Sequence, residues 1–130
     1  MQLDYLIPVL LVGFILFIII KNVIINGIKS ESPIQIMNYL YNPGYMFIDV
    51  RDKDEFFAGH IPKSVNIPFS QISSLLKQIP NDKQLIIASK SSKRSKKAIS
   101  FLKDKGYDQL INLKGGLLAW QQAGYPLECG

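Results

Sequence analysis

The residues best suited to chemistry lie in one short polar segment, Ser89-Lys90-Ser91-Ser92-Lys93-Arg94-Ser95. It follows the apolar run 85–88 and opens a predicted helix. Five cations within eight positions carry +5, which equals the net charge of the whole chain: Lys90, Lys93, Arg94, Lys96 and Lys97. Such a cluster suits a small oxyanion, an acidic protein partner or, beside a membrane, anionic lipid. The alternative is a solvated helix face, which charge runs usually form.

The rest of the chain offers little for metal or redox chemistry. His60 is the only histidine, and Cys129, next to the C-terminus, is the only cysteine. A metal site needs several such ligands, so we expect no metal and no cofactor. One cysteine cannot form an intramolecular disulfide, which agrees with a reducing compartment. No aromatic residues interleave the basic cluster, so no nucleic-acid partner is expected.

The elements that must position the polar segment alternate between strands and helices. Continuous apolar runs predict buried parallel strands over 45–50, 85–88 and 110–113, with a brief strand around Val65. Capping patterns and apolar spacing predict helices over 33–41, from 53 to Gly59, over 72–79, from the polar segment 89–95 to Gly106 and around Trp120. This order predicts an α/β fold with a parallel sheet flanked by helices on both faces.

The first 28 residues differ in character from the rest. Residues 5–20 carry no charge, and the apolar character continues beyond Lys21, so a membrane-spanning helix is predicted over 5–25. A cleaved signal peptide would need a basic start and a small-residue cleavage site, and a small domain could not cover so long an apolar helix. The sequence therefore predicts an anchor at 1–28, a linker at 29–32 and one domain at 33–130. Because Lys21 and Lys29 follow the helix, the positive-inside rule places the domain of this single-pass protein in the cytoplasm.

Five segments of the domain together resemble the rhodanese family, over residues 31–128. Phe47-Ile48-Asp49-Val50-Arg51 is similar to the family's Asp-Val-Arg strand end. Glu55-Phe56, Gly59-His60-Ile61-Pro62 and Val65-Asn66-Ile67-Pro68 are similar to its Glu-Phe, Gly-His-Ile-Pro and Asn-Ile-Pro. Leu113-Lys114-Gly115-Gly116-Leu117-Leu118-Ala119-Trp120 is similar to its final Leu-x-Gly-Gly-x-x-x-Trp. Each motif is weak alone, but the five follow the family's order and spacing.

The resemblance implies a sulfurtransferase whose active loop reads Cys-x-x-Gly-x-Arg-Ser and stabilises an anion with its backbone N–H groups. Matching Arg94-Ser95 to the end of this motif places Ser89 at the cysteine and Ser92 at the glycine. Loop length is that of the sulfurtransferases, since the family's phosphatases carry one residue more. A persulfide requires sulfur on the protein, and a serine hydroxyl needs a general base to act as a nucleophile. The resemblance also assigns Asp49 and Arg51 a supporting role on the loop side of the sheet.

A serine at the glycine position has a conformational cost if that position needs a positive φ. Because Ser89 and Ser92 stand at the motif's cysteine and glycine while the other motifs match, we expect a membrane-anchored rhodanese-like domain without sulfurtransferase activity. It would act as a binding or scaffold module. The alternatives are enzymes: a sulfurtransferase using Cys129, a hydrolase using Ser89, or a sulfurtransferase seen as a Cys-to-Ser variant. Cys129 itself is expected to be a flexible terminal thiol, and His60 a hydrogen-bonded structural residue.

Overall fold

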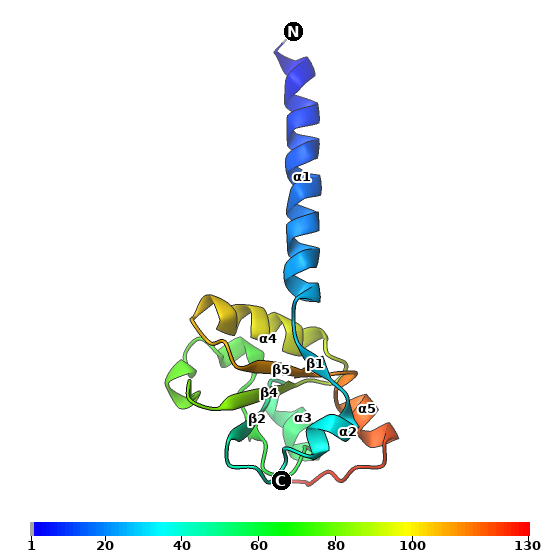
Figure 1. Ribbon diagram of the computed structural model, residues 1–130, viewed down its shortest axis with the longest axis vertical. Coiled ribbons are helices and arrows are strands. Elements are labelled where there is room, and N and C mark those ends of the chain that lie inside the picture. Colours follow the sequence, from blue (N-terminus) through cyan, green and yellow to red (C-terminus); the bar gives the residue numbers. More distant parts are fainter. Residues whose placement is uncertain (1) are drawn as a thin grey trace.

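Five parallel strands form the centre of the domain in the computed structural model, which describes residues 2–130 (Figure 1). They are β1 (Ser30–Glu31), β2 (Tyr45–Asp49), β3 (Val65–Asn66), β4 (Gln84–Ala88) and β5 (Leu110–Leu113). The order across the sheet is β1-β5-β4-β2-β3, and every neighbouring pair is parallel. Strand β4 lies in the middle, and Leu85, Ile86 and Ile87 are buried on both of its sides. The predicted parallel sheet is confirmed, because these continuous aliphatic runs satisfy a strand that has no solvent face.

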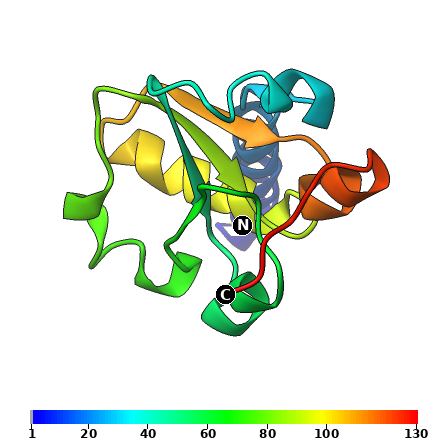
Figure 2. The same cartoon turned by 90° about the horizontal axis from the view of Figure 1, so that it is seen from below.

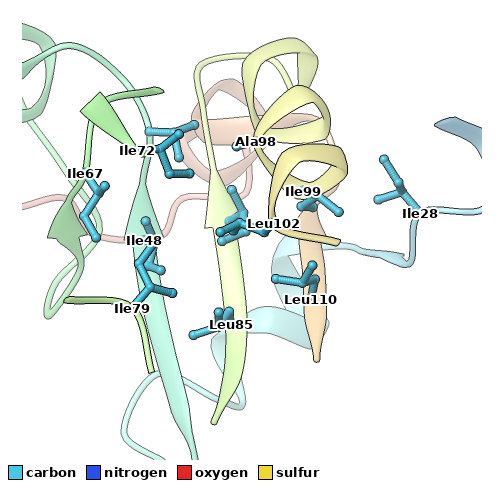
Figure 3. Close-up of a cluster of buried hydrophobic side chains, with 12 residues drawn as sticks. Ile28, Ile48, Ile67, Ile72, Ile79, Leu85, Ala98, Ile99, Leu102 and Leu110 are labelled. Carbon is cyan, nitrogen blue, oxygen red and sulfur yellow. The ribbon is translucent and has the colours of Figure 1, made fainter. Parts of the chain in front are cut away.

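Helices cover both faces of this sheet, as predicted (Figures 1 and 2). One face is covered by α4 (Lys93–Asp104), and the other by α2 (Pro33–Met37), α3 (Lys53–Ala58) and α5 (Gly116–Gln122). Each face has its own hydrophobic cluster. Ile99 and Leu102 of α4 pack on Ile48 and Leu85 in one of them (Figure 3). Trp120 belongs to the second, where it packs the last helix onto the sheet.

One predicted helix is shorter in the structure, and another is absent from it. The helix predicted over 33–41 ends at Met37, and turns with i to i+3 bonds follow, such as that from the Tyr39 N–H to the Ile36 carbonyl at 2.9 Å. The predicted surface helix over 72–79 is wrong, since residues 72–75 form turns between two 3₁₀ turns, Phe69–Gln71 and Leu76–Gln78. Here the Ser74 hydroxyl donates to the Gln71 carbonyl at 2.9 Å, so a side chain competes for helical backbone bonds.

The segment 29–32, expected to be a linker, contains the edge strand β1. The Lys29 carbonyl accepts a hydrogen bond from the Asn112 N–H of β5, and the Glu31 carbonyl accepts one from the Lys114 N–H just after β5, both at 2.8 Å. A two-residue strand has no periodic pattern, so nothing in the sequence distinguishes it from a loop.

The N-terminal helix α1 (Leu3–Asn26) stands away from the domain (Figure 1). Its 24 residues extend about 36 Å, and a bilayer core is about 30 Å thick. The part from Leu3 to Val23 is long and apolar enough to cross a membrane and is not buried in the domain, although signal sequences share these properties. Met1, which the predicted anchor 1–28 includes, lies outside the described residues.

Candidate functional site

The loop between β4 and α4 holds Ser89 in a buried position at the carboxyl end of the central strand. Ligands of open α/β sheets bind at this edge. The Ser89 side chain is 1% exposed, and its Oγ accepts bonds from the backbone N–H groups of Ser92 and Ser95, both at 3.2 Å. Its hydroxyl also donates to Ser95 Oγ at 3.1 Å. The loop amides therefore converge on the atom that replaces the expected thiol sulfur.

A chain of buried polar groups continues from Ser89 into the sheet. Ser95 Oγ donates to Asn112 Oδ1 at 2.6 Å, and Asn112 Nδ2 donates to Ser30 Oγ at 3.1 Å. This chain connects the loop to β5 and to β1. Sequence reasoning missed Asn112, although an amide inside the apolar run Leu-Ile-Asn-Leu was a signal that a buried polar partner exists.

Ser92 adopts the left-handed conformation, with φ 81° and ψ −13°. This confirms that the loop needs a positive φ where the resemblance places a glycine. The Ser92 hydroxyl donates to the Leu113 carbonyl at 3.0 Å, and the side chain is buried. The positive φ destabilises a serine relative to a glycine, and the buried hydrogen bond, which a glycine could not make, offsets this cost.

The Gly115–Gly116 turn presses directly against the loop. The Leu117 and Leu118 N–H groups at the start of α5 donate to the Ser89 and Lys90 carbonyls, at 2.9 and 3.2 Å. A Cβ on Gly116 would lie 2.4 Å from the Lys90 carbonyl oxygen, and the residue has φ 65°. Glycine is required here because both the conformation and the space exclude a side chain.

A buried ion pair lies at the end of β2, next to the loop. Asp49 and Arg51 are 1% and 8% exposed, and the Arg51 Nη2 is 2.8 Å from Asp49 Oδ2. The same Nη2 donates to the Gly59 carbonyl at 2.6 Å. Asn66 Nδ2 donates to the Arg51 carbonyl at 2.9 Å, so the pair also fixes the segment that leads to β3. Both charges are compensated within the framework.

Arg94, the last loop position before Ser95, is also paired. Its Nη1 and Nη2 donate to the two carboxylate oxygens of Glu55 at 2.9 and 3.0 Å, which joins α4 to α3. The hydrogen bond from Arg94 lowers the pKa of Glu55, and the reciprocal bond raises the pKa of Arg94. The sequence placed both residues in motifs but did not reveal the pairing. Its consequence is that Arg94 contributes a compensated charge to the basic cluster.

A pocket of about 300 Å³ opens beside the loop. Arg51, Glu55 and Lys90 contribute its polar wall, and Leu117, Leu118 and Leu127 contribute apolar surface. The other exposed cations of the cluster, Lys93 and Lys97, lie on α4, whereas Ser91 is exposed within the loop itself. Two cations line the pocket. Arg51 is paired with Asp49, whereas no ion pair within residues 2–130 involves Lys90.

Neither of the other reactive side chains reaches Ser89. His60 is buried, its Nδ1 lies 2.9 Å from the Phe56 carbonyl, and its ring stacks on Phe56 at 3.8 Å. It is the hydrogen-bonded structural residue that the sequence suggested. The hydrogen-bond partners of the Ser89 hydroxyl within the described chain are Ser95 Oγ and the N–H groups of Ser92 and Ser95. In residues 2–130 no cluster of three metal-ligating side chains occurs.

Cys129 is not on a free tail, contrary to expectation. The flanking Glu128 exchanges two backbone bonds of 2.8 Å with His60, and the Gly130 N–H donates to the Phe57 carbonyl at 3.0 Å. The exposed thiol of Cys129 lies 3.5 Å from the carbonyl oxygen of Ala58, a residue that lines the pocket. The thiol therefore has a defined position beside Ala58, one of the residues that line the pocket.

Comparisons with known proteins match this architecture. The family model for the rhodanese-like domain matches residues 32–123. A sulfurtransferase of Allochromatium vinosum is 32% identical over 103 residues, which cover 79% of this chain and 94% of that protein. A putative sulfurtransferase of Bacillus subtilis is 31% identical, over 61% of this chain and 76% of its own.

The structural comparison agrees. The crystal structure of a rhodanese-related protein from Thermoplasma volcanium superposes with a TM-score of 0.72 at 27% identity, covering 78% of this chain and 99% of the other. Some relatives are longer, and the chain spans 45% and 56% of two of them, from Synechocystis and Arabidopsis thaliana. The matched family model covers most of the chain, and the chain belongs to the rhodanese-like domain family.

Proposed function

We propose that this chain is a membrane-anchored rhodanese-like domain that has lost sulfur transfer and acts as a binding or scaffold module. The observation that carries the proposal is the place of Ser89 Oγ, at the point where the loop amides of Ser92 and Ser95 converge. Ser92 also departs from the motif, but it keeps the positive φ of that position, so the group that the reaction lacks is the sulfur.

The chemistry of the two atoms explains the loss. A cysteine thiol has a pKa of about 8.5, which an electropositive loop lowers to about 3.5–7.5, so a thiolate is available at neutral pH. A serine hydroxyl ionises far above this range and forms no stable counterpart of a persulfide. No base lies within hydrogen-bonding distance of Ser89 among the described residues, so the hydrolase alternative lacks the proton acceptor that it needs.

The pocket beside the loop supports a binding role. Lys90 supplies an exposed cation without an acidic partner in the described chain, and Leu117 and Leu118 supply apolar surface next to it. Helix α4 begins at Lys93 beside this loop, and the N-terminus of a helix favours negative charge, although its Ser95 N–H already donates to Ser89 Oγ. The ligand suited to this combination is a small oxyanion or an acidic side chain of a protein partner, held by the loop Ser89–Ser95.

The anchor completes the proposal. Helix α1 has the length and composition of a single membrane span, and Gly27 to Lys29 connect it directly to β1. The lysines at 21 and 29 follow the span and Asp4 precedes it, which favours a cytoplasmic domain.

The test is the rate of thiocyanate formation from thiosulfate and cyanide by the full-length chain in detergent. We expect the rate of the protein-free reaction, because no thiol lies at position 89. The matched positive control is the Ser89→Cys variant, which we expect to exceed the background rate. A rate well above background for the unmodified chain would overturn the proposal.

A second candidate function is sulfur transfer by Cys129, favoured by the contact of its thiol with the carbonyl of Ala58, which lines the pocket. In this reaction the thiolate attacks the outer sulfur of thiosulfate, a sulfur–sulfur bond forms on the protein, and sulfite leaves with the electron pair of the broken bond. Mass spectrometry after thiosulfate treatment tests it. A gain of one sulfur atom that Cys129→Ser abolishes would support this function, and an unchanged mass would eliminate it.

A further inference from the structure

The first half of the outward face of α4 carries a cluster of lysines. Ser95, Ala98, Ile99 and Leu102 face the sheet and are buried. Turned away from them are Lys93 and Lys97, both exposed, and Lys96, partly exposed. No acidic residue occurs between positions 90 and 103, and no ion pair involves these three lysines within residues 2–130. We call Lys93, Lys96 and Lys97 the α4 lysine face.

This face lies on the side of the domain from which α1 rises. In Figure 1, α4 covers the upper face of the sheet, and α1 extends from that same side, whereas α2, α3 and α5 lie below the sheet. Helix α1 also contacts α4 directly. The side of the domain that carries the lysine face is therefore the side closest to whatever surrounds α1.

The connection between the two parts is too short to allow a large displacement. Helix α1 ends at Asn26 and β1 begins at Ser30. Ile28, in the middle of this connection, is 8% exposed and packs in the cluster that contains Ile99 and Leu102 of α4 (Figure 3). The chain that leaves the helix is thus fixed to the domain next to α4 within two residues.

We infer that the α4 lysine face docks on the anionic phospholipid headgroups of the bilayer that holds α1. The inference rests on the proposed anchor and adds a surface, an orientation and a lipid class to it. Anionic headgroups attract cations within about one Debye length, which is about 8–10 Å at physiological salt. The short connection keeps the lysine face at the membrane, where lipid charge is always present, and this favours lipid over a soluble acidic partner. Docking of the α4 lysine face does not use the pocket lined by Lys90 and Leu118, which can bind a separate ligand.

The chain contains matched control lysines on its other side. Lys53 is exposed on α3, below the sheet, and Lys83 is exposed beside Tyr41 and Pro43, which follow α2. The same reagent acetylates all four amines, and each lysine is compared only with itself in the two kinds of disc. Their different positions allow the test to be made within one unmodified molecule.

The experiment places the full-length chain in nanodiscs of phosphatidylcholine, alone or mixed with phosphatidylserine, and measures acetylation of each lysine by mass spectrometry. We expect acetylation of Lys93 and Lys97 to be about five-fold slower in the anionic discs, the effect of roughly one headgroup contact per lysine. Rates at Lys53 and Lys83 should be equal in the two discs. Molar salt should remove the difference, since it shortens the screening length.

Three outcomes separate the claims. Equal rates at Lys93 and Lys97 in both discs, with the chain incorporated, would overturn the docking and leave the anchor intact. Slowing at Lys53 and Lys83 as well would overturn it too, because a general depletion of reagent near anionic lipid would then explain the effect. Failure of the chain to enter either disc would overturn the anchor and the docking together. None of these outcomes changes the assay of sulfur transfer.

Discussion

The Gly115–Gly116 turn and the loop Ser89–Ser95 touch each other and impose the same backbone demand, but they meet it with different residues. Gly116 has φ 65°, and Ser92 has φ 81°. At Gly116 the neighbouring carbonyl oxygens leave no room for a Cβ, whereas the Ser92 side chain fits and bonds the Leu113 carbonyl. At Ser89 the hydroxyl oxygen is buried and accepts the N–H groups of Ser92 and Ser95 of the same loop. Of two adjoining positions with positive φ, packing therefore requires a glycine at Gly116 and accommodates a hydrogen-bonded serine at Ser92.

The largest effect should come from filling the turn. Gly116→Ala places a methyl group 2.4 Å from a carbonyl oxygen at a positive φ, and we expect it to lower the free energy of unfolding by about 4 kcal/mol. Urea titration in detergent, followed by the emission of the single, buried Trp120, measures this quantity. The control is Gly124→Ala, at φ 79° with no atom within 4 Å, which should cost only about 1 kcal/mol of backbone strain. Equal losses would show that the turn does not press on the loop.

The framework ion pair should rank next. Asp49→Asn leaves the buried Arg51 guanidinium without a countercharge, and we expect a loss of about 3 kcal/mol in the same titration. Asp52→Asn is the control, because its carboxylate is 73% exposed and 3.8 Å from Arg94, so its loss should be close to zero. A loss at Asp49 no larger than that at Asp52 would contradict a structural role for the pair.

A smaller and pH-dependent effect is expected at the Arg94–Glu55 pair, which joins the loop to α3. The bond to Arg94 lowers the pKa of Glu55 in the folded chain, so its stabilisation is present above the ordinary carboxyl pKa of 4.5 and disappears as the pH falls through the lowered value. Both side chains are about one-third exposed, so Glu55→Gln should cost only about 0.5–1 kcal/mol at pH 7. Urea titrations at pH 7 and below pH 4 should show this difference shrinking in acid. A constant difference would mean that the carboxylate charge is not involved.

The smallest effect should be that of Ser92→Gly. Relief of the left-handed conformation favours the glycine, and loss of the bond to the Leu113 carbonyl opposes it, each by about 1 kcal/mol. The free energy of unfolding should therefore change by less than about 1 kcal/mol. A large loss would show that the hydroxyl has become essential to the loop, and a large gain that strain dominates at this position.

The sequence was informative wherever a local pattern carries the structure. The apolar runs of β2, β4 and β5 specify buried strands, and the motif spacing placed Ser89 and Ser92 correctly in the loop. The apolar spacing over 72–79 was misleading. Ile72, Leu75, Leu76 and Ile79 are buried or partly buried in the observed turns, just as they would be on one face of a helix. Whether such a segment forms a helix or turns depends on side chains that compete for its backbone hydrogen bonds, such as Ser74, and on packing against the sheet.

The parts of the site that the sequence could not give are long-range contacts. The bond between Arg94 and Glu55 joins residues 39 positions apart, and the bond between Asn112 and Ser30 joins residues 82 apart. The position of Cys129 depends in the same way on the pairing of Glu128 with His60. No spacing rule predicts these partners, because the folded sheet brings them together.

The most direct test of the central claim, that the framework is intact and only the sulfur is missing, is the intact mass of two chains after thiosulfate treatment. In a Cys129→Ser background, the chain with Ser89 should keep its mass. The chain that also carries Ser89→Cys should gain one sulfur atom, located at residue 89 by fragmentation. Failure of the Ser89→Cys chain to take up sulfur while folded would contradict the claim, because the loop and its framework would then no longer support the reaction.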